Sequence, residues 1–185
     1  MTVACDVPIT LEPLSGEAFA PFGQLVTPPG AREPDFVGYG STGWDVELHI
    51  SGRPQLLILR NPFLGLRAGV LERHAEVTQA VFALTAVPAA LIVARPGPDG
   101  GAPRLEDVRA FRVDGGCGYV LHRETWHAPD RYPLYPPGAD YALLTEWETT
   151  SGDAPDRDGR TEIVDCEGLF GGTLLVTLAT GGQPR

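Results

Sequence analysis

Three of the chain's four histidines lie in two short segments, and the first segment also carries a carboxylate and an amide. Glu72 and His74 stand two residues apart, and Gln79 follows five residues later. Side chains two apart on a β-strand point to the same face, so we expect Glu72 and His74 to share one side of a strand. Gln79, early in the next strand, is placed to return to the same cavity. Such a set suits binding of a divalent metal or acid–base catalysis.

The second segment contains His122, Trp126 and His127. His122 lies four residues after Gly118 and is the leading candidate for a catalytic base or a metal ligand, because an imidazole titrates near neutral pH. His127 is interpreted either as a hydrogen-bonding partner behind the site or as a proton donor. Trp126 is expected to line the cavity beside the substrate. The fourth histidine, His49, lies in a segment without a motif.

The spacing of these residues resembles the metal-binding motifs of cupin barrels. A first cupin motif reads His-x-His-x4-Glu, and a second supplies one more histidine after a glycine-rich turn. Glu72 stands at the first histidine position, His74 matches the second, and Gln79 replaces the glutamate. His122 corresponds to the histidine of the second motif. The resemblance implies a divalent metal, such as nickel, iron, manganese or zinc, held by Glu72, His74, Gln79 and His122.

Four stretches resemble a narrower family, the ureidoglycolate lyases. Residues 14–23 are similar to the family's "EAF…YG" opening, and 72–80 to its "ERH…QAF" segment. Residues 122–129 resemble its "HR..WHHP" signature, and 140–144 its Asp-aromatic-apolar strand. The similarity covers about residues 11–147. It implies a cupin-fold enzyme of allantoin degradation, in purine metabolism, that cleaves ureidoglycolate into urea and glyoxylate.

The resemblance also suggests roles in that reaction. Cleavage needs a base for the substrate hydroxyl, an acid for the leaving nitrogen and a cation or metal for the carboxylate. His122 is expected to act as base or metal ligand, and His74 or His127 as the acid. Glu72, if buried with a raised pKa, would share that role. Gln79 and Trp126 are expected to bind the substrate.

Several positions depart from the family pattern. Ala128 follows His127 where the family has a second histidine, and Thr145-Glu146 stands where it has Asp-Arg. Residues 41–49 contain no arginine, although the family has one there. If a missing arginine binds the substrate carboxylate, the substrate differs. Two alternatives therefore stay open: another small-molecule cupin enzyme (a metal-dependent oxygenase, isomerase or hydrolase of a specialised pathway), or a non-catalytic ligand-binding cupin.

The elements that must position these residues are mostly short strands. A short helix is predicted within residues 11–26, with Ser15 as its N-cap, and residues 27–43 are predicted to be loop. Apolar runs bounded by glycine, proline or aspartate predict strands at 55–59, 79–84, 89–94, 108–113, 118–121, 141–147 and 174–178. This pattern favours an all-β, cupin-like β-barrel (a double-stranded β-helix) with a short N-terminal helix.

Composition excludes several classes of function. The formal net charge is −10, so a nucleic-acid backbone or an anionic membrane surface would repel the chain. All 14 basic residues are arginine, which excludes lysine Schiff-base chemistry and a P-loop. No apolar run is long enough for a membrane span, and no signal peptide is visible. We expect a cytoplasmic enzyme with a small-molecule substrate, and a homodimer by analogy with other cupin-like barrels.

The 185 residues are predicted to form a single domain. An acidic polar segment at 151–159 is interpreted as a loop. It separates the main body from a C-terminal strand pair, so that residues 148–185 form a loop and two strands rather than a second domain.

Overall fold

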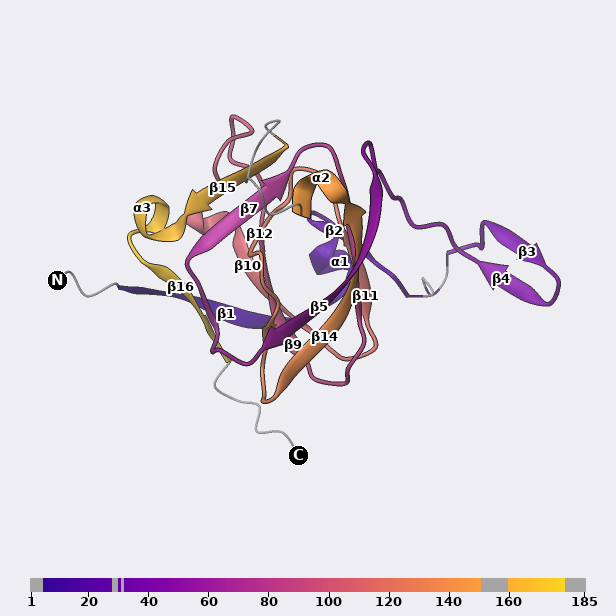
Figure 1. Ribbon diagram of the computed structural model, residues 1–185, viewed down its shortest axis with the longest axis horizontal. Helices are drawn as coiled ribbons and strands as arrows, with labels where there is room; N and C mark the ends of the chain where they lie inside the picture. The colour runs from indigo at the N-terminus through magenta and orange to yellow at the C-terminus, as the bar shows by residue number, and fades with distance from the viewer. Residues whose placement is uncertain (1–4, 28–29, 31, 151–159, 179–185) are drawn as a thin grey trace.

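The computed structural model describes residues 5–27, 30, 32–150 and 160–178. These residues form a β-rich body of two curled sheets and a separate two-stranded hairpin (Figure 1). The helical elements are short: α1 (Gly16–Phe19), α2 (Trp147–Thr150), α3 (Cys166–Phe170) and a 3-10 turn, η1 (Leu105–Asp107). Within the described ranges, no helix is long and apolar enough to cross a membrane.

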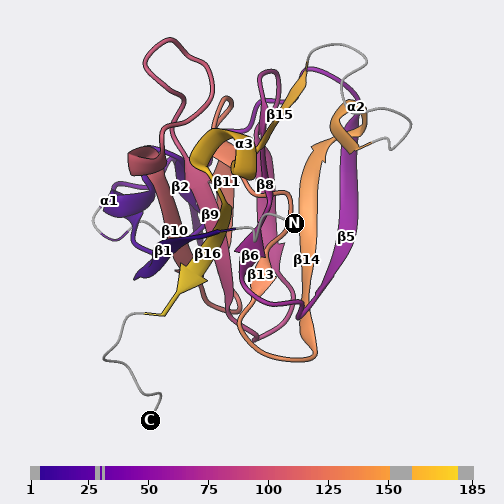
Figure 2. The same ribbon diagram turned by 90° about the vertical axis from the view of Figure 1, so that its left-hand side faces the viewer.

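The larger sheet has nine strands, and the smaller has five (Figure 2). The larger runs in the order β15 (Thr161–Asp165), β7 (Val70–His74), β12 (Trp126–His127), β9 (Ala89–Ala94), β10 (Val108–Val113), β1 (Asp6–Pro13), β16 (Thr173–Thr177) and β6 (Arg67–Ala68), with β13 (Tyr132–Pro133) also paired to β9. The smaller runs β2 (Gly23–Leu25), β11 (Gly118–Leu121), β8 (Gln79–Ala83), β14 (Gly138–Glu146) and β5 (Pro54–Pro62).

Strand β9 lies between two hydrophobic cores and is buried on both faces. Leu91 and Val93 contribute to the core between the two sheets, together with Tyr119 and Tyr141 from the five-stranded sheet. Ala90, Ile92 and Ala94 contribute to a second core, which β1, β16 and α3 cover. Burial on both faces explains why β9 reads as an unbroken apolar run. The barrel interior is the region between the facing sides of the two sheets, and this core occupies much of it.

The predicted fold class is confirmed. The short helix α1 begins after Ser15, whose hydroxyl accepts a hydrogen bond from the Ala18 amide at 3.2 Å. The seven predicted strands correspond to β5, β8, β9, β10, β11, β14 and β16. Strand β1 was not predicted, because the helix signal at Ser15 dominates that segment.

Two parts of the chain differ from expectation. Residues 27–43 are not all loop: β3 (Phe36–Gly38) and β4 (Ser41–Gly43) form a hairpin whose turn has positive φ at Tyr39 and Gly40. Three-residue strands are too short to leave a periodic pattern. The two C-terminal strands do not pair with each other, since β15 pairs with β7 and β16 with β1 and β6. The predicted loop at 151–159 lies outside the described residues.

Candidate metal centre and anion-binding residues

Strands β7 and β12 bring three side chains together in the barrel interior. The strands are antiparallel with His127 opposite Glu72, and His74 shares a face with Glu72. One ligand-type atom from each of these residues lies within 4.8 Å of the other two. The Nε2 atoms of His127 and His74 lie 3.4 and 3.6 Å from Glu72 Oε1. These distances are long for hydrogen bonds, so both nitrogens face a shared point without being paired.

The orientation of each imidazole is fixed by its other nitrogen. His127 Nδ1 lies 3.0 Å from the Thr125 carbonyl oxygen. A carbonyl only accepts, so Nδ1 donates and Nε2 carries the free lone pair. His74 Nδ1 lies 2.9 Å from Thr161 Oγ1, because β15 pairs with β7 with Thr161 opposite His74. Partners of this kind hold metal-binding histidines in position.

Electrostatics favour the protonation states that bind a metal. Burial lowers the pKa of His127, which is 1% exposed, and Glu72 opposes this shift only in part. Burial raises the pKa of Glu72, but its interactions with His127 and His74 outweigh burial and lower that pKa overall. The expectation of a raised pKa at Glu72 is therefore wrong, because two imidazoles face its carboxyl group. At neutral pH the cluster contains a carboxylate and a neutral His127.

These three residues fit a divalent metal. Two imidazole nitrogens and one carboxylate form the facial arrangement of many non-haem metal sites. The two Nε2 atoms are buried and have no hydrogen-bond partner in the described part of the chain. Buried polar atoms are rarely left unpaired, so this orphaned pair indicates a missing ligand.

Sequence reasoning missed Arg131, which lies in the interior near this cluster. Arg131 is 4% exposed; its Nε donates to the Tyr119 hydroxyl at 3.1 Å and its Nη1 to the Pro129 carbonyl at 2.9 Å. Its Nη2 is buried and has no hydrogen-bond partner among the described residues. The positive charge of Arg131 interacts with the Glu72 carboxylate and disfavours protonation of His127. A buried cation with a free donor is a binding group for an anion.

Two more polar groups in the interior lack partners. The Gln79 Oε1 and Tyr141 hydroxyl are buried without a hydrogen bond from the described residues. Gln79 lies two residues before Val81 on β8, so the two side chains share a face. Val81 belongs to the core between the sheets, and Gln79 therefore faces the interior, as expected from its spacing. Burial raises the pKa of Tyr141 to about 12, which keeps its hydroxyl protonated. Together with Arg131 they offer two donors and an acceptor for a polar ligand.

The structure does not place His122 in the cluster. Strand β11 ends at Leu121, and the chain turns at Glu124, which has positive φ, before β12 begins. His122 is half-buried and lines a separate polar cleft with His49, Thr78 and Glu124. Its predicted place beside Glu72 and His74 is therefore not found, and His127 stands there instead.

Trp126 lies on the opposite face of β12 from His127. Its indole is fully buried in the core covered by β1 and β16, where Nε1 donates to the Gly101 carbonyl at 3.1 Å. The guanidinium of Arg73 stacks on the ring at 4.8 Å. Arg73 also pairs with Glu162 on β15, so both residues connect strands and neither is brought to the cluster.

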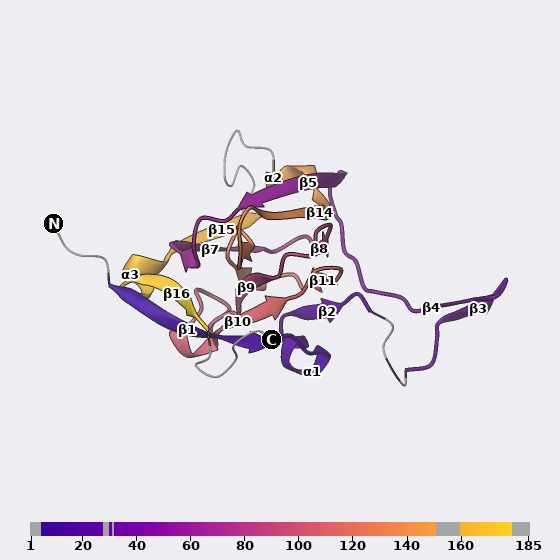
Figure 3. The same cartoon turned by 90° about the horizontal axis from the view of Figure 1, so that it is seen from below.

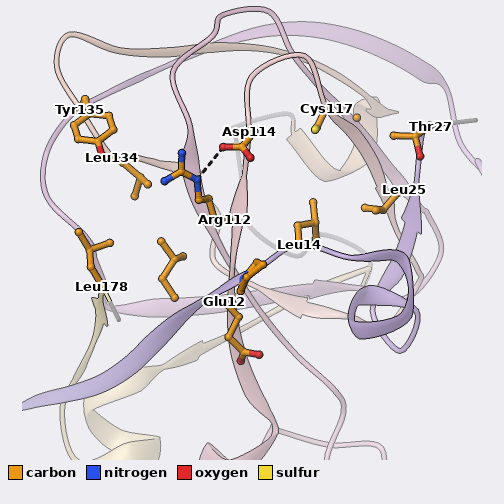
Figure 4. Close-up of a pocket in the computed structure, with 13 residues that line it drawn as sticks. Glu12, Leu14, Leu25, Thr27, Arg112, Asp114, Cys117, Leu134, Tyr135 and Leu178 are labelled. Carbon is orange, nitrogen blue, oxygen red and sulfur yellow. Dashed lines mark hydrogen bonds and ion pairs between the residues drawn. The ribbon is translucent and has the colours of Figure 1, made fainter. Parts of the chain in front are cut away.

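A second cavity lies apart from the cluster and contains none of the predicted site residues (Figure 4). Its volume is about 830 Å³. Leu14, Leu25 and Leu134 give it apolar walls, and an Arg112–Asp114 ion pair lies at its side. The unpaired polar atoms are in the barrel interior, so that interior is the better candidate for a polar substrate.

The fold and the cluster define a cupin-type barrel with two histidines and one carboxylate as its candidate metal ligands. The family model described as ureidoglycolate lyase matches residues 6–150. The chain belongs to the ureidoglycolate lyase family, as the sequence motifs indicate.

Individual relatives agree with this family. Ureidoglycolate lyases from Pseudomonas putida (strain W619), Pseudomonas savastanoi pv. phaseolicola and Stutzerimonas stutzeri are 36%, 35% and 35% identical to this chain over 129, 132 and 129 residues. Each match covers 65% of this chain and 74 or 75% of the relative. Among solved structures, RmlC from Streptococcus suis in complex with dTDP-D-xylose has a TM-score of 0.34 at 8% identity, covering 54% of this chain and 48% of that chain.

Proposed function

We propose that this protein is a carbon–nitrogen lyase that cleaves ureidoglycolate into urea and glyoxylate in the barrel interior. The observation that carries the proposal is that two kinds of unpaired buried group lie close enough to interact electrostatically. The cluster of Glu72, His74 and His127 offers ligand atoms, and Arg131 offers a free donor with a positive charge. Ureidoglycolate has a hydroxyl and a carboxylate that fit these two groups.

Arg131 is assigned to the substrate carboxylate. The chain has no lysine, so arginine is its only side chain that is positively charged at any working pH. Among the described residues, Arg73 is also buried, but it pairs with Glu124 and Glu162 on the other face of β7. Arg131 makes no ion pair with a described residue, and a carboxylate would supply the missing partner. This assignment offers one arginine for the substrate carboxylate, while residues 41–49 and 145–146 still lack the arginines of the family pattern.

The reaction transfers one proton and breaks one carbon–nitrogen bond. The hydroxyl proton leaves as the C–O bond becomes the carbonyl of glyoxylate, the C–N bond breaks, and the urea nitrogen receives a proton. No net proton is consumed, so one group can accept the proton and return it. In metal-free protein, Glu72 Oε1 and His127 Nε2 are free to accept the proton; with a metal on those atoms, the second carboxylate oxygen of Glu72 remains as the acceptor. The protonated Tyr141 hydroxyl is suited to donating a hydrogen bond.

Glu72, His74 and His127 would hold a divalent metal. When bound, such a metal polarises the substrate hydroxyl and lowers its pKa. Nickel, iron, manganese and zinc all accept this set of ligands. Gln79 lies on the same side of the barrel, and we assign its amide to the ureido group of the substrate rather than to the metal.

Chelation followed by reconstitution tests the metal and the reaction together. Glyoxylate release from racemic ureidoglycolate is measured before chelation, after removal of the chelator, and after addition of each metal. We expect release to fall after chelation and to return with at least one metal. Unchanged release from metal-free protein would remove the metal from this proposal and leave Glu72 and His127 as acid–base groups alone.

A metal-dependent oxygenase is the second candidate. Two histidines and one carboxylate are the arrangement that binds Fe(II) in many oxygenases. Oxygen uptake that requires Fe(II), in a preparation that releases no glyoxylate, would favour it.

We also infer that the protein acts in the cytoplasm, without binding nucleic acid or membranes. A net charge of −10 opposes both kinds of anionic surface.

A further inference from the structure

One edge of the Arg131 guanidinium is only half occupied. The Nε and Nη2 atoms of an arginine share one edge, which matches the two oxygens of a carboxylate. Arg60 binds Asp140 through this edge, with both nitrogen–oxygen distances at 2.8 Å. In Arg131, Nε donates to the Tyr119 hydroxyl at 3.1 Å, and the buried Nη2 has no hydrogen-bond partner among the described residues. The open half of this edge therefore lies directly beside the Tyr119 hydroxyl.

The Tyr119 hydroxyl still has a proton to donate. A tyrosine hydroxyl carries one proton and also accepts hydrogen bonds, and towards Arg131 it acts as the acceptor. No residue in the described ranges accepts its proton, although the side chain is only 1% exposed. A buried donor without an acceptor costs free energy that a bound ligand can recover. Tyr119 and Arg131 Nη2 therefore offer two adjacent donors to one missing acceptor.

A third unpaired donor comes from Tyr141 on the same face of the five-stranded sheet. Strand β8 lies between β11 and β14, and Figure 3 shows these three strands side by side. Tyr119 pairs with Val81, and Tyr141 pairs with Ala83, two residues further along β8. Both tyrosines belong to the core between the two sheets, and the Tyr141 hydroxyl is buried without a partner in the described part of the chain. The charge of Arg131 also acts on Tyr141, so the three groups lie in one region of the barrel interior.

We propose that Tyr119 is a substrate-binding residue that extends the reach of Arg131. Its hydroxyl accepts from Arg131 Nε and donates its proton to one oxygen of the substrate carboxylate, and Arg131 Nη2 donates to the other oxygen. The Tyr141 hydroxyl supplies the third donor to the same carboxylate. This inference rests on the proposed function for the identity of the anion, and it adds two residues to the binding of that anion.

Two physical effects favour a carboxylate over a neutral group in this subsite. A hydroxyl that accepts from a guanidinium becomes a stronger donor, because the charge polarises its O–H bond in the low dielectric of the interior. Three converging donors also need an acceptor with several lone pairs, which a carboxylate has. A primary amide of the same shape would turn its NH2 group towards one of these donors and leave that donor unpaired. The subsite should therefore select a carboxylate over the corresponding amide.

Direct binding of glycolate tests the subsite without requiring turnover. Glycolate has the hydroxyl and the carboxylate of ureidoglycolate but no ureido group. Calorimetry with chelator-treated protein should show glycolate binding by the wild type, and binding of the uncharged glycolamide that is at least about 10-fold weaker. Tyr119→Phe and Tyr141→Phe each remove one hydroxyl and should each weaken glycolate binding about 10-fold. Tyr132→Phe, in the second core, is the matched control and should bind glycolate like the wild type.

Replacement of Tyr119 by 3-fluorotyrosine separates hydrogen-bond donation from a structural role. The fluorinated side chain keeps the ring and the hydroxyl but makes the proton more acidic. At slightly acidic pH, where the hydroxyl keeps its proton, glycolate should therefore bind about 2-fold more tightly. A merely structural role of the hydroxyl would leave the affinity unchanged or lower it. This replacement also tests the proposal if circular dichroism shows that Tyr119→Phe does not fold.

Four results would overturn the proposal. An unchanged glycolate affinity in Tyr119→Phe, or no tightening with 3-fluorotyrosine, would remove Tyr119 from the subsite. Equal affinities for glycolate and glycolamide, or no binding of glycolate by the wild type at millimolar concentration, would remove the subsite itself. Glycolate binding that depends on Tyr119, in a protein that releases no glyoxylate from ureidoglycolate, would retain the subsite and overturn the proposed lyase activity.

Discussion

Glu72 is the residue on which the cluster depends, because it supplies the negative charge that two imidazoles face. His127 on β12 and His74 on β7 both place Nε2 near Glu72 Oε1. In each histidine the other ring nitrogen, Nδ1, already has a hydrogen-bond partner. Both Nε2 atoms lack a hydrogen-bond partner among the described residues. We propose that a metal or a substrate completes the arrangement.

At the residue scale, Arg131→Met tests the carboxylate site. Removing a buried charge-assisted hydrogen bond to the substrate should raise KM and lower kcat/KM by about 100-fold, or about 3 kcal/mol. A modest loss of stability is expected, since the Tyr119 hydroxyl and the Pro129 carbonyl lose their donor while a buried charge is removed. Steady-state kinetics with ureidoglycolate measure the effect. Arg112→Met, in an exposed ion pair with Asp114, is the matched control. An unchanged KM in Arg131→Met would remove Arg131 from the site.

Local spacing predicted the residues of β7 and Gln79 at the start of β8, but not the residues that long-range pairing adds. Glu72 and His74 are two residues apart on β7, so alternation alone places them together. The position of His127 depends on its long-range pairing with Glu72, which no local pattern encodes. Arg131 follows the family signature by two residues, and its burial is decided by the tertiary structure. The sequence gives only a weak indication of a role for Arg131: it lies close to the motif at 122–129, in a chain that contains no lysine.

At the element scale, the C-terminal part of the chain belongs to the site. Strand β15 adds an edge to β7 and supplies Thr161, which holds the His74 ring from behind. Sequence reasoning identified strands in this region but could not find their partners, because pairing with β7 joins segments 87 residues apart. The β3–β4 hairpin is a local structure, but its three-residue strands are too short to show the two-residue alternation that predicts a strand.

Thr161→Val tests this contribution. The substitution keeps the shape of the side chain and removes the hydroxyl, so His74 loses its orienting partner. Metal affinity should fall about 10–100-fold, with the fold preserved. Titration of metal-free protein with zinc or manganese measures it. Thr177→Val, which removes a β16 hydroxyl that donates to the Ile9 carbonyl on β1, is the control. Equal metal affinity in both variants would mean that Thr161 does not orient a ligand.

At the scale of the whole molecule, the second core joins the C-terminal helix α3 to the sheet through Cys166. Burial raises the pKa of this thiol to about 11 from an ordinary value of 9.0. Because the pKa is higher in the folded state, the protonated thiol contributes its full stability below pH 9, the ordinary pKa of the unfolded thiol. That stability is lost as the pH rises toward 11, because the unfolded thiol ionises first.

The alkaline stability of a Cys166→Ala variant checks this. Two pKa units correspond to about 2.7 kcal/mol in total. About 2 kcal/mol of this falls between pH 9 and pH 11, so the loss of unfolding free energy over that range should be smaller in the variant by up to about 2 kcal/mol. Urea denaturation at each pH measures the loss. Cys5→Ala, at an exposed cysteine, should follow the wild-type curve. Parallel curves for Cys166→Ala and the wild type would contradict the assignment.

The measurement that tests the central claim most directly is glyoxylate release from ureidoglycolate by four proteins: wild type, Glu72→Gln, Glu76→Gln and His122→Ala. Glu76 is exposed and near Glu72 in sequence, and His122 lies in the separate cleft. We predict release by the wild type, at least a 100-fold loss in Glu72→Gln, and near-wild-type rates in the other two. A wild-type rate in Glu72→Gln, or a loss confined to His122→Ala, would contradict a reaction centred on Glu72, His74 and His127.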